Sequence, residues 1–572
     1  MTCNVTTGTG GSGTGTGGTM SSGGTGGTTG TTATGGTAGG SATGGAAGAA
    51  GGTPGQACAG TAPWTTASGD VQIVVNAGQK GQPWSRFYEM AVASDHANTI
   101  LSTAYGRNSQ GAIKKAHDQA GFQYIRFHGI LDSDIGVYGE NNGTPVYTWT
   151  RFDQVYDAIT GAGMRPIVEI SFTPPSLASS NMILTNLWYN NVSPNISKPA
   201  DWTKWENFMQ AIVQHLEGRY GVAEVQGHWF FEVWNEPSWM YQGGDAGYNE
   251  LYMHTARGLL AGDPLVKVGG PAGSAGETPG LLSGLVSYTK SNNLKLDFVS
   301  WHRYANDNGG AYADANVMAS FYDSLMQNTI NASGFKGLVI NDEWGACYDA
   351  NVVRDTEVSA SFIAKTVHLI GTDAAYGPPY MFGWWAISDL YEEFNTGSAT
   401  AFRDGGNFGL MLKGDPQIPA SFDVPKPAFN AFRLLHLMGD TRVSTTGGTT
   451  SDGVNAVATV SNSGNAVQVL VYNHVNGGGG NSASSSQVKI TVNNIPGTGT
   501  FTVRHYMLDR THANSYQAWV GMGKPSNPSA SQWTQLSAAA DLCYYETTGT
   551  GTTWTATFPE NVYSVSLIVL SR

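Results

Sequence analysis

The sequence predicts an α/β protein, a (β/α)8 TIM barrel with a C-terminal antiparallel β-sandwich domain. Two observations predict it. Eight apolar runs alternate with amphipathic stretches between about residues 84 and 438, and after residue 439 short strand-like runs alternate with Gly, Ser and Asn turns. We therefore predict four parts, which are a tether at 1–62, an N-terminal segment at 63–83, the barrel at 84–438 and the sandwich at 439–572.

The eight runs are almost continuously apolar, as in strands buried on both faces of a parallel sheet. They cover residues 86–93, 122–129, 165–172, 228–236, 266–270, 296–301, 337–344 and 380–388. A doubly wound open sheet is the alternative. That fold would more often carry a Gly-rich phosphate loop after its first strand, and residues 91–100 do not form one.

Amphipathic stretches between these runs predict helices. The clearest covers residues 201–221, with apolar side chains on one 3.6-residue stripe, Asp201 at the N-cap and Gly221 just beyond the end. Residues 110–121, 150–163 and 356–371 are predicted to be helical in the same way.

Alternating runs at 455–462, 465–475, 486–495, 501–508 and 562–571 predict the strands of the sandwich. We expect residues 71–78 (VQIVVNAG) to join that sandwich, although they precede the barrel.

Charge and composition exclude several partners. The formal net charge is −13 with no basic run, which argues against nucleic acid, and no window is apolar enough for a membrane span. Four cysteines in 572 residues exclude a disulfide scaffold, and no Cys/His cluster suggests a metal. A single bridge, Cys347–Cys543, is one pairing that an exported protein would allow.

The first 60 residues are almost entirely Gly, Thr, Ala and Ser, which predicts a flexible tether. Cys3 has two readings of equal weight. It is the lipidated residue of a bacterial lipoprotein whose leader has been removed, or an unpaired cysteine at an arbitrary start.

Two glutamates mark a candidate active site. Glu236 ends the fourth apolar run, and Glu343 lies at the C-terminal end of the seventh. Because functional groups of a (β/α)8 barrel lie at the C-terminal ends of its strands, we expect the two carboxylates to meet at one mouth. Two such carboxyl groups can cleave a glycosidic bond, one as acid/base and the other as nucleophile.

The ordered motifs resemble glycoside hydrolase family 39, which contains β-xylosidases and α-L-iduronidases. The resemblance covers about residues 71–572 and is carried by residues 121–138, 205–221, 229–237, 267–272, 297–304, 340–344, 383–393, 408–411, 425–439 and 509–529. It implies a retaining enzyme with Glu236 as general acid/base and Glu343 as nucleophile. We expect an apolar shell of Phe231, Trp234 and Trp239 around Glu236, and hydrogen-bond donors from His302 and Tyr304 to Glu343.

Further substrate-binding residues follow from the resemblance and from their places at strand ends. We expect Asn235 to contact the sugar 2-OH, His128 to contact a hydroxyl, and Arg126 to support the carboxylates. Aromatic stacking on the sugar is expected for Trp385 more than for Phe172, and Glu392 and Glu393 are expected to hold outer hydroxyls of the terminal sugar. His128 as a core histidine, the two rings as barrel packing and Glu392–Glu393 as a solvated acidic pair are the structural alternatives.

The sequence leaves the sugar open. Tyr304 follows the xylosidase branch and residues 340–344 (INDEW) follow the iduronidase branch, so we expect an exo-acting β-xylosidase-like hydrolase. The alternatives are release of another sugar or disaccharide containing arabinose or galactose, endo-cleavage of an exopolysaccharide, or, from another class, a surface protein that only binds carbohydrate. No cofactor is implied, since two carboxylates and water suffice. We expect an exported or surface-anchored bacterial protein.

Overall fold

The computed structural model describes residues 6–7, 55–65, 68–102, 108–184, 194–349, 351–389, 409–412, 414, 417–449, 452–477 and 485–572. Cys3, Glu392 and Glu393 lie outside these residues, so their predicted roles stay predictions.

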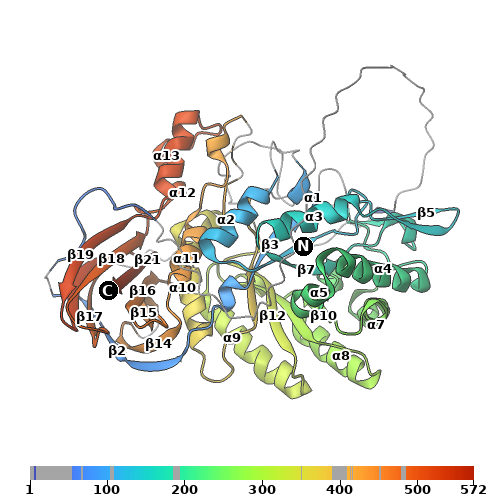
Figure 1. The fold of residues 1–572 in the computed structure, drawn as a ribbon, viewed down its shortest axis with the longest axis horizontal. Coiled ribbons are helices and arrows are strands. Elements are labelled where there is room, and N and C mark those ends of the chain that lie inside the picture. The colour runs from blue at the N-terminus through green and yellow to red at the C-terminus, as the bar shows by residue number, and fades with distance from the viewer. Residues whose placement is uncertain are drawn as a thin grey trace, which may run out of the picture.

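Eight parallel strands close into a barrel in the order β10-β11-β12-β13-β3-β4-β7-β9, which confirms the predicted fold class (Figure 1). They are β3 (Ala91–His96), β4 (Tyr124–His128), β7 (Arg165–Ile170), β9 (Phe230–Val233), β10 (Lys267–Gly273), β11 (Phe298–Tyr304), β12 (Leu338–Gly345) and β13 (Met381–Trp384). Each predicted run contains or overlaps one strand. The first is displaced, because Phe87–Glu89 form a short 3-10 helix before β3.

Helices connect the barrel strands on the outside. They are α1 (Ala97–Leu101), α2 (Gln110–Ala120), α3 (Thr150–Gly161), α4 (Trp202–Tyr220), α5 (Val222–His228), α6 (Pro237–Met240), α7 (Gly244–Gly262), α8 (Thr278–Ser291), α9 (Ala315–Leu325), α10 (Glu357–Thr372) and α11 (Pro427–His436). Asp201 caps α4 as predicted, since its carboxylate accepts the Lys204 N–H at 3.0 Å. A hairpin of β5 (Tyr138–Asn141) and β6 (Thr144–Tyr147) extends the loop after β4, and β1 (Thr6–Thr7) pairs with β8 (Met182–Ile183).

Side chains fill the barrel interior in layers, because alternate residues of each strand point inward. The lowest layer is a cluster of Ala91, Tyr124, Ile167, Phe230, Phe298, Ile340 and Met381. Two residues further along their strands, the next layer contains Arg126, Glu169, Glu232 and Asp342, all buried. The apolar layer thus closes the bottom of the barrel, and a charged layer lies directly beneath its mouth.

The second domain is one nine-stranded sheet in the order β19-β18-β21-β16-β15-β14-β2-β17-β20. Its strands are β2 (Val71–Pro83), β14 (Thr441–Gly447), β15 (Gly453–Val460), β16 (Ala466–His474), β17 (Ser486–Asn493), β18 (Thr500–Leu508), β19 (Tyr544–Thr550), β20 (Trp554–Glu560) and β21 (Ser564–Ser571). Apolar side chains from β2, β17 and β20 pack in one core with those from β16, β18 and β21, so the sheet folds over on itself as a sandwich.

Strand β2 lies inside this sheet although it precedes the barrel in sequence (Figure 1). It pairs antiparallel with β14 and parallel with β17, and the parallel pair is the exception in an otherwise antiparallel sheet. Helices α12 (Ser515–Gly521) and α13 (Ala530–Ala540) follow β18 and were not predicted.

The Cys347–Cys543 bridge that the sequence allowed is not formed. Cys543 is bonded to Cys58, and Cys347 is a buried free thiol just after β12. The backbone N–H of Cys58 also donates to the carbonyl of Tyr544 at 2.9 Å, and Thr65 forms a bridge with Thr557. Residues 55–62, predicted as part of the tether, therefore lie against the sandwich.

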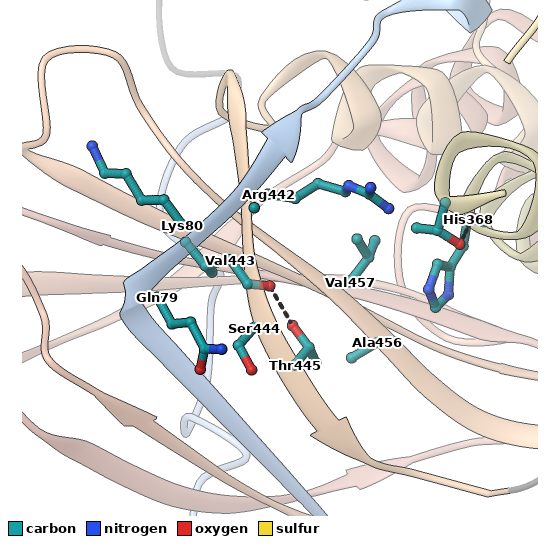
Figure 2. Close-up of a pocket in the computed structure, with 11 residues that line it drawn as sticks. Gln79, Lys80, His368, Arg442, Val443, Ser444, Thr445, Ala456 and Val457 are labelled. Carbon is teal, nitrogen blue, oxygen red and sulfur yellow. Dashed lines mark hydrogen bonds between the residues drawn. The ribbon is translucent and has the colours of Figure 1, made fainter. Parts of the chain in front are cut away.

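A cavity of about 300 Å³ lies where the two domains meet, between α10 and strands β2, β14 and β15 (Figure 2). It is lined by Gln79, Lys80, Gly81, His368, Thr372, Arg442, Val443, Ser444, Thr445, Ala456 and Val457. None of the predicted site residues lines this cavity. Among the described helices, none is both long enough and apolar enough to cross a membrane.

Candidate active site

Glu236 follows the end of β9 at the first turn of α6. Its backbone is left-handed, with φ of 39° and ψ of 60°, and Trp234 two residues earlier has φ of 72°. Left-handed backbone is uncommon in residues other than glycine, and it concentrates at functional sites. The Glu236 N–H donates to the carbonyl of Ala272 in β10 at 3.0 Å, which fixes this conformation against the neighbouring strand.

Glu343 lies in β12 at an irregularity of the strand. Asn341 pairs with Trp301 and Glu343 pairs with His302, so Asp342 is an extra residue opposite β11. Such a β-bulge breaks the alternation of side chains. As a result Asp342 and Glu343, although consecutive, both contact the interior side chains Arg126 and His302.

The two predicted catalytic glutamates meet at one end of the barrel. One carboxylate oxygen from each and a ring nitrogen of His302 all lie within 4.8 Å of one another. The side chains of Glu236 and Glu343 are 13% and 10% exposed, whereas His302 beneath them is 1% exposed. The two carboxylates are therefore accessible from the mouth of the barrel, whereas the side with His302 is closed to solvent.

Each oxygen of the Glu236 carboxylate has a hydrogen-bonding neighbour. His302 Nδ1 lies 2.8 Å from Oε1, and the indole N–H of Trp239 donates to Oε2 at 2.6 Å. Trp239 was predicted as part of an apolar shell, but its contact with Glu236 is this hydrogen bond from the indole N–H.

Glu343 has the donors that were predicted for it. The Tyr304 hydroxyl donates to Oε1 at 2.5 Å, and His302 Nδ1 lies 3.4 Å from Oε2. Arg126 Nη1 adds a longer contact at 3.5 Å. Burial raises the pKa of Glu343 above its usual range, and the neighbouring His302 opposes this rise.

Arg126 holds the charged layer beneath the two glutamates. Its guanidinium lies 2.8 Å from Glu169, 2.6 Å from Glu232 and 3.0 Å from Asp342, and it donates to the amide oxygen of Asn235 at 2.7 Å. The predicted supporting contacts of Arg126 are therefore present. They reach Glu343 in β12 and Asn235, which is next to Glu236.

Residues 71–553 match the family model described as glycosyl hydrolases family 39. This chain belongs to that family. A beta-xylosidase of Geobacillus stearothermophilus is 28% identical over 482 residues, which cover 80% of this chain and 87% of that protein.

Solved structures of family 39 share the fold. The enzyme from Xanthomonas axonopodis pv. citri superimposes with a TM-score of 0.74 and 26% identity, covering 89% of this chain and 98% of that one. A family 39 beta-xylosidase from Caulobacter crescentus gives 0.71 and 27%, covering 88% and 100%. This family 39 chain is accordingly a retaining glycoside hydrolase, and the closeness of its two carboxylates fits retention, for which the carboxyl groups lie about 5–5.5 Å apart.

The remaining predicted binding residues of this family 39 member surround the pair. His128 Nδ1 lies 2.8 Å from Glu169 Oε2, and the His128 ring packs against Trp385 with centroids 4.7 Å apart and the ring planes tilted by 34°. Asn235 uses its amide oxygen for Arg126 and its amide nitrogen for Met240 Sδ. Phe172 is fully buried and packs edge-to-face on Trp234. The structure brings these residues to the site, and their contacts with a sugar stay predictions.

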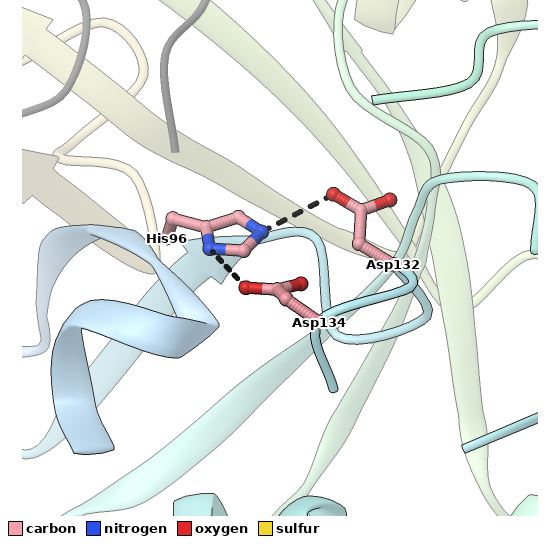
Figure 3. Close-up of side chains that lie close together, drawn as sticks. All are labelled: His96, Asp132 and Asp134. Carbon is pink, nitrogen blue, oxygen red and sulfur yellow. Dashed lines mark hydrogen bonds and ion pairs between the residues drawn. The ribbon is translucent and has the colours of Figure 1, made fainter. Parts of the chain in front are cut away.

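A second group of acids and a histidine lies near the mouth. His96 at the end of β3 is flanked by Asp132 and Asp134 from the loop after β4 (Figure 3). Asp132 faces Nε2 at 3.2 Å and Asp134 faces Nδ1 at 3.6 Å, so the two carboxylates approach different ring nitrogens. Nδ1 already accepts the Asn98 N–H. Burial lowers the pKa of His96 to about 4 and raises that of Asp132 to about 8, so this arrangement suits a neutral hydrogen-bonded contact that holds the loop better than three ligands converging on a metal.

Glu169, Glu232 and Asp342 belong to the site but were not predicted from the sequence. The signal was present, since each is a charged residue inside an otherwise apolar strand, at RPIVEI, WFFEV and LVINDEW. A buried charge in such a strand needs a partner, and Arg126 in YIRFH is the matching one.

Proposed function

We propose that this chain is an exo-acting retaining β-xylosidase in which Glu236 is the general acid/base and Glu343 the nucleophile. The observation that carries the proposal is the meeting of these two carboxylates over His302 at the barrel mouth.

In the first step an oxygen of Glu343 attacks the anomeric carbon, while the bond from that carbon to the leaving oxygen breaks. The proton of Glu236 goes to the leaving oxygen, and a glycosyl ester forms on Glu343. The donors Tyr304, His302 and Arg126 keep the attacking carboxylate oriented.

In the second step Glu236, now a carboxylate, takes a proton from water. The water oxygen attacks the anomeric carbon, the ester bond breaks and Glu343 leaves as a carboxylate. Two inversions give net retention. The Trp239 and His302 contacts hold Glu236 on the same side for both proton transfers.

Xylose is the proposed sugar because relatives along most of the chain are beta-xylosidases. Tyr304 supports it in a second way. Its side chain is neutral and its hydroxyl donates to Glu343, so position 304 offers no cation to a uronic acid carboxylate.

Export to an oxidising compartment is also part of the proposal, supported by the Cys58–Cys543 disulfide. Anchoring through a lipid on Cys3 would leave the tether between the membrane surface and the enzyme. Mass spectrometry of the mature N-terminus in the native host tests this, and an unmodified Cys3 would exclude the anchor.

Glu343→Gln and Glu236→Gln distinguish the two roles. We expect Glu343→Gln to lose turnover by about four orders of magnitude or more on every glycoside. Glu236→Gln should retain the first step on aryl xylosides with a good leaving group, because that group needs no proton. Equal losses on good and poor leaving groups in Glu236→Gln would contradict its role as the acid.

The sugar is tested with aryl β-xyloside, β-glucoside, β-galactoside and arabinoside substrates side by side, with NMR detection of the first-formed anomer. We expect β-xylose as the first product. Turnover of a galactoside or arabinoside without any xyloside turnover would move the assignment to another sugar. Binding of xylo-oligosaccharides without turnover of any of the four would leave only a carbohydrate-binding protein.

A further inference from the structure

The β-bulge in β12 places a carboxylate behind the active site that no step of the proposed reaction uses. We propose that Asp342 is a positioning residue, which holds the His302 ring from behind so that its Nδ1 bridges Glu236 and Glu343. The inference rests on the proposed function and assigns a role to a residue whose side chain is fully buried.

His302 lies between three carboxylates. Its Nδ1 faces the mouth, 2.8 Å from Glu236 and 3.4 Å from Glu343, and its Nε2 faces the interior, 3.6 Å from Asp342 Oδ1. One ring thus contacts both reacting carboxyls on one edge and Asp342 on the other. His302 and Asp342 are both almost fully buried, so bulk solvent does not reach either side chain.

Asp342 also reaches the site through Arg126. Its other oxygen, Oδ2, lies 3.0 Å from Arg126 Nε, and the same guanidinium contacts Glu343 and Asn235. Asp342 therefore joins the two cations that lie beneath the reacting carboxyls. The bulge makes this geometry possible, since regular alternation would turn either Asp342 or Glu343 out of the barrel.

The charges of the cluster agree with this role. Burial disfavours the charged form of Asp342, but Arg126 and His302 outweigh it and hold the pKa of Asp342 below its usual range. Burial raises the pKa of the adjacent Glu232 well above its usual range, and Asp342 adds to that rise against the opposing Arg126. Burial alone would lower the pKa of His302, yet Glu343 and Asp342 raise it well above the usual value.

A positively charged His302 favours the ionised form of Glu343, which is the form that attacks. If Asp342 is neutralised, His302 releases its proton more readily and that positive charge is lost. His302 is the first cause that opposes the raised pKa of Glu343, whereas Asp342's own charge is not among its main causes, so the balance at Glu343 is a rise in pKa. Glu343 then takes up a proton at a higher pH than in the parent.

Asp342→Asn tests the inference through the pH dependence of kcat/KM on an aryl β-xyloside. We expect the acidic limb to move up by about one pH unit, which corresponds to about a tenfold loss below the optimum. The shift should be clearly smaller when Asp342→Asn is added to a His302→Gln background, because only the route through Arg126 then remains. If Asp342→Asn does not fold, by circular dichroism, Asp342→Ser replaces it in both backgrounds.

Glu560→Gln is the matched control, since it removes another fully buried carboxyl, in β20 of the sandwich. Its profile should superimpose on that of the parent. A folded Asp342→Asn with the parent's pH profile would overturn the inference, as would a shift of equal size in the His302→Gln background. A parent inactive on all glycosides would instead contradict the proposed function.

Discussion

Glu343 shows how single side chains determine the chemistry of this site. The nucleophile must be ionised to attack, but burial raises its pKa. Donors from three different side chains, Tyr304, His302 and Arg126, oppose that effect. Activity on the acidic side should therefore fall as Glu343 takes up a proton, at a pH above the usual range of a glutamate.

Tyr304→Phe should raise the pKa of Glu343 further, so that activity is lost at a higher pH on the acidic side. The variant removes the hydroxyl that donates to Glu343 Oε1 at 2.5 Å, and such a bond stabilises the charged form. We expect kcat/KM to fall about tenfold to a hundredfold, since a hydrogen bond to a charged group contributes roughly 1.5–3 kcal/mol. The acidic limb of the pH profile should move to higher pH, measured with the same aryl xyloside from pH 4 to pH 9.

Tyr156→Phe is the control for this substitution. Tyr156 lies in α3 of the barrel, and its buried hydroxyl has no hydrogen-bond partner within the described part of the chain. Its profile should match the parent. An unchanged acidic limb in Tyr304→Phe would show that the hydroxyl does not stabilise the carboxylate.

The residues of the site were predictable only to the extent that strand ends and a family resemblance identify them. Glu236, Glu343, His302 and Tyr304 were placed correctly at one mouth because barrel strands converge there. That Asp342 and Glu343 both face the interior could not be predicted, since it depends on a one-residue bulge that no local pattern shows. The indole contact of Trp239 likewise depends on the left-handed turn at Glu236.

At the scale of elements, the hydrophobic pattern of the sequence was sufficient to predict most strands and helices. The eight apolar runs became the eight barrel strands because each is buried on both faces. The first run was displaced because Phe87 and Tyr88, although apolar and buried, lie in a 3-10 helix below the barrel. The β5–β6 hairpin was missed because its residues are partly exposed and lack an apolar run.

Close packing of two helices gives a stability prediction. Gly258 of α7 lies against α4, where an added Cβ would come within 2.5 Å of the Glu206 carbonyl and 2.6 Å of Met209 Cβ. Gly258→Ala should therefore lower the melting temperature, because overpacking costs about 1–3 kcal/mol and exceeds the helix-propensity gain of about 1 kcal/mol.

Gly218→Ala is the control, because it raises helix propensity without overpacking. Gly218 lies within α4, and an added Cβ there has no atom within 4 Å. Calorimetry should show a slightly raised melting temperature for this variant. If Gly258→Ala is stabilised as much as Gly218→Ala, the two helices are not in the close contact described.

At the scale of the whole molecule, the disulfide ties the N-terminal segment to the sandwich. Cys58 and Cys543 are 485 residues apart in sequence, which is why no sequence argument could pair them. Spacing gives no information about distance between such remote cysteines, and Cys347 was as suitable a candidate until its buried place after β12 was known.

Cys58→Ser should lower the melting temperature. Removing a native disulfide typically costs about 2–5 kcal/mol, and this one restrains residues 55–65 against β19 and β20. Differential scanning calorimetry with and without dithiothreitol makes the measurement. Reductant should destabilise the parent but not the variant, and equal melting temperatures of the two without reductant would contradict the prediction.

The place of β2 has a consequence for biosynthesis. Its inward side chains Ile73 and Val75 pack in the sandwich core, between β14 and β17. On the ribosome, these residues emerge before the barrel, whereas their partner strands at 441–447 and 486–493 emerge after it. During synthesis the barrel can therefore fold before β2 has its partner strands. A chain truncated at residue 438 would leave both edges of β2 unpaired and its apolar side chains exposed.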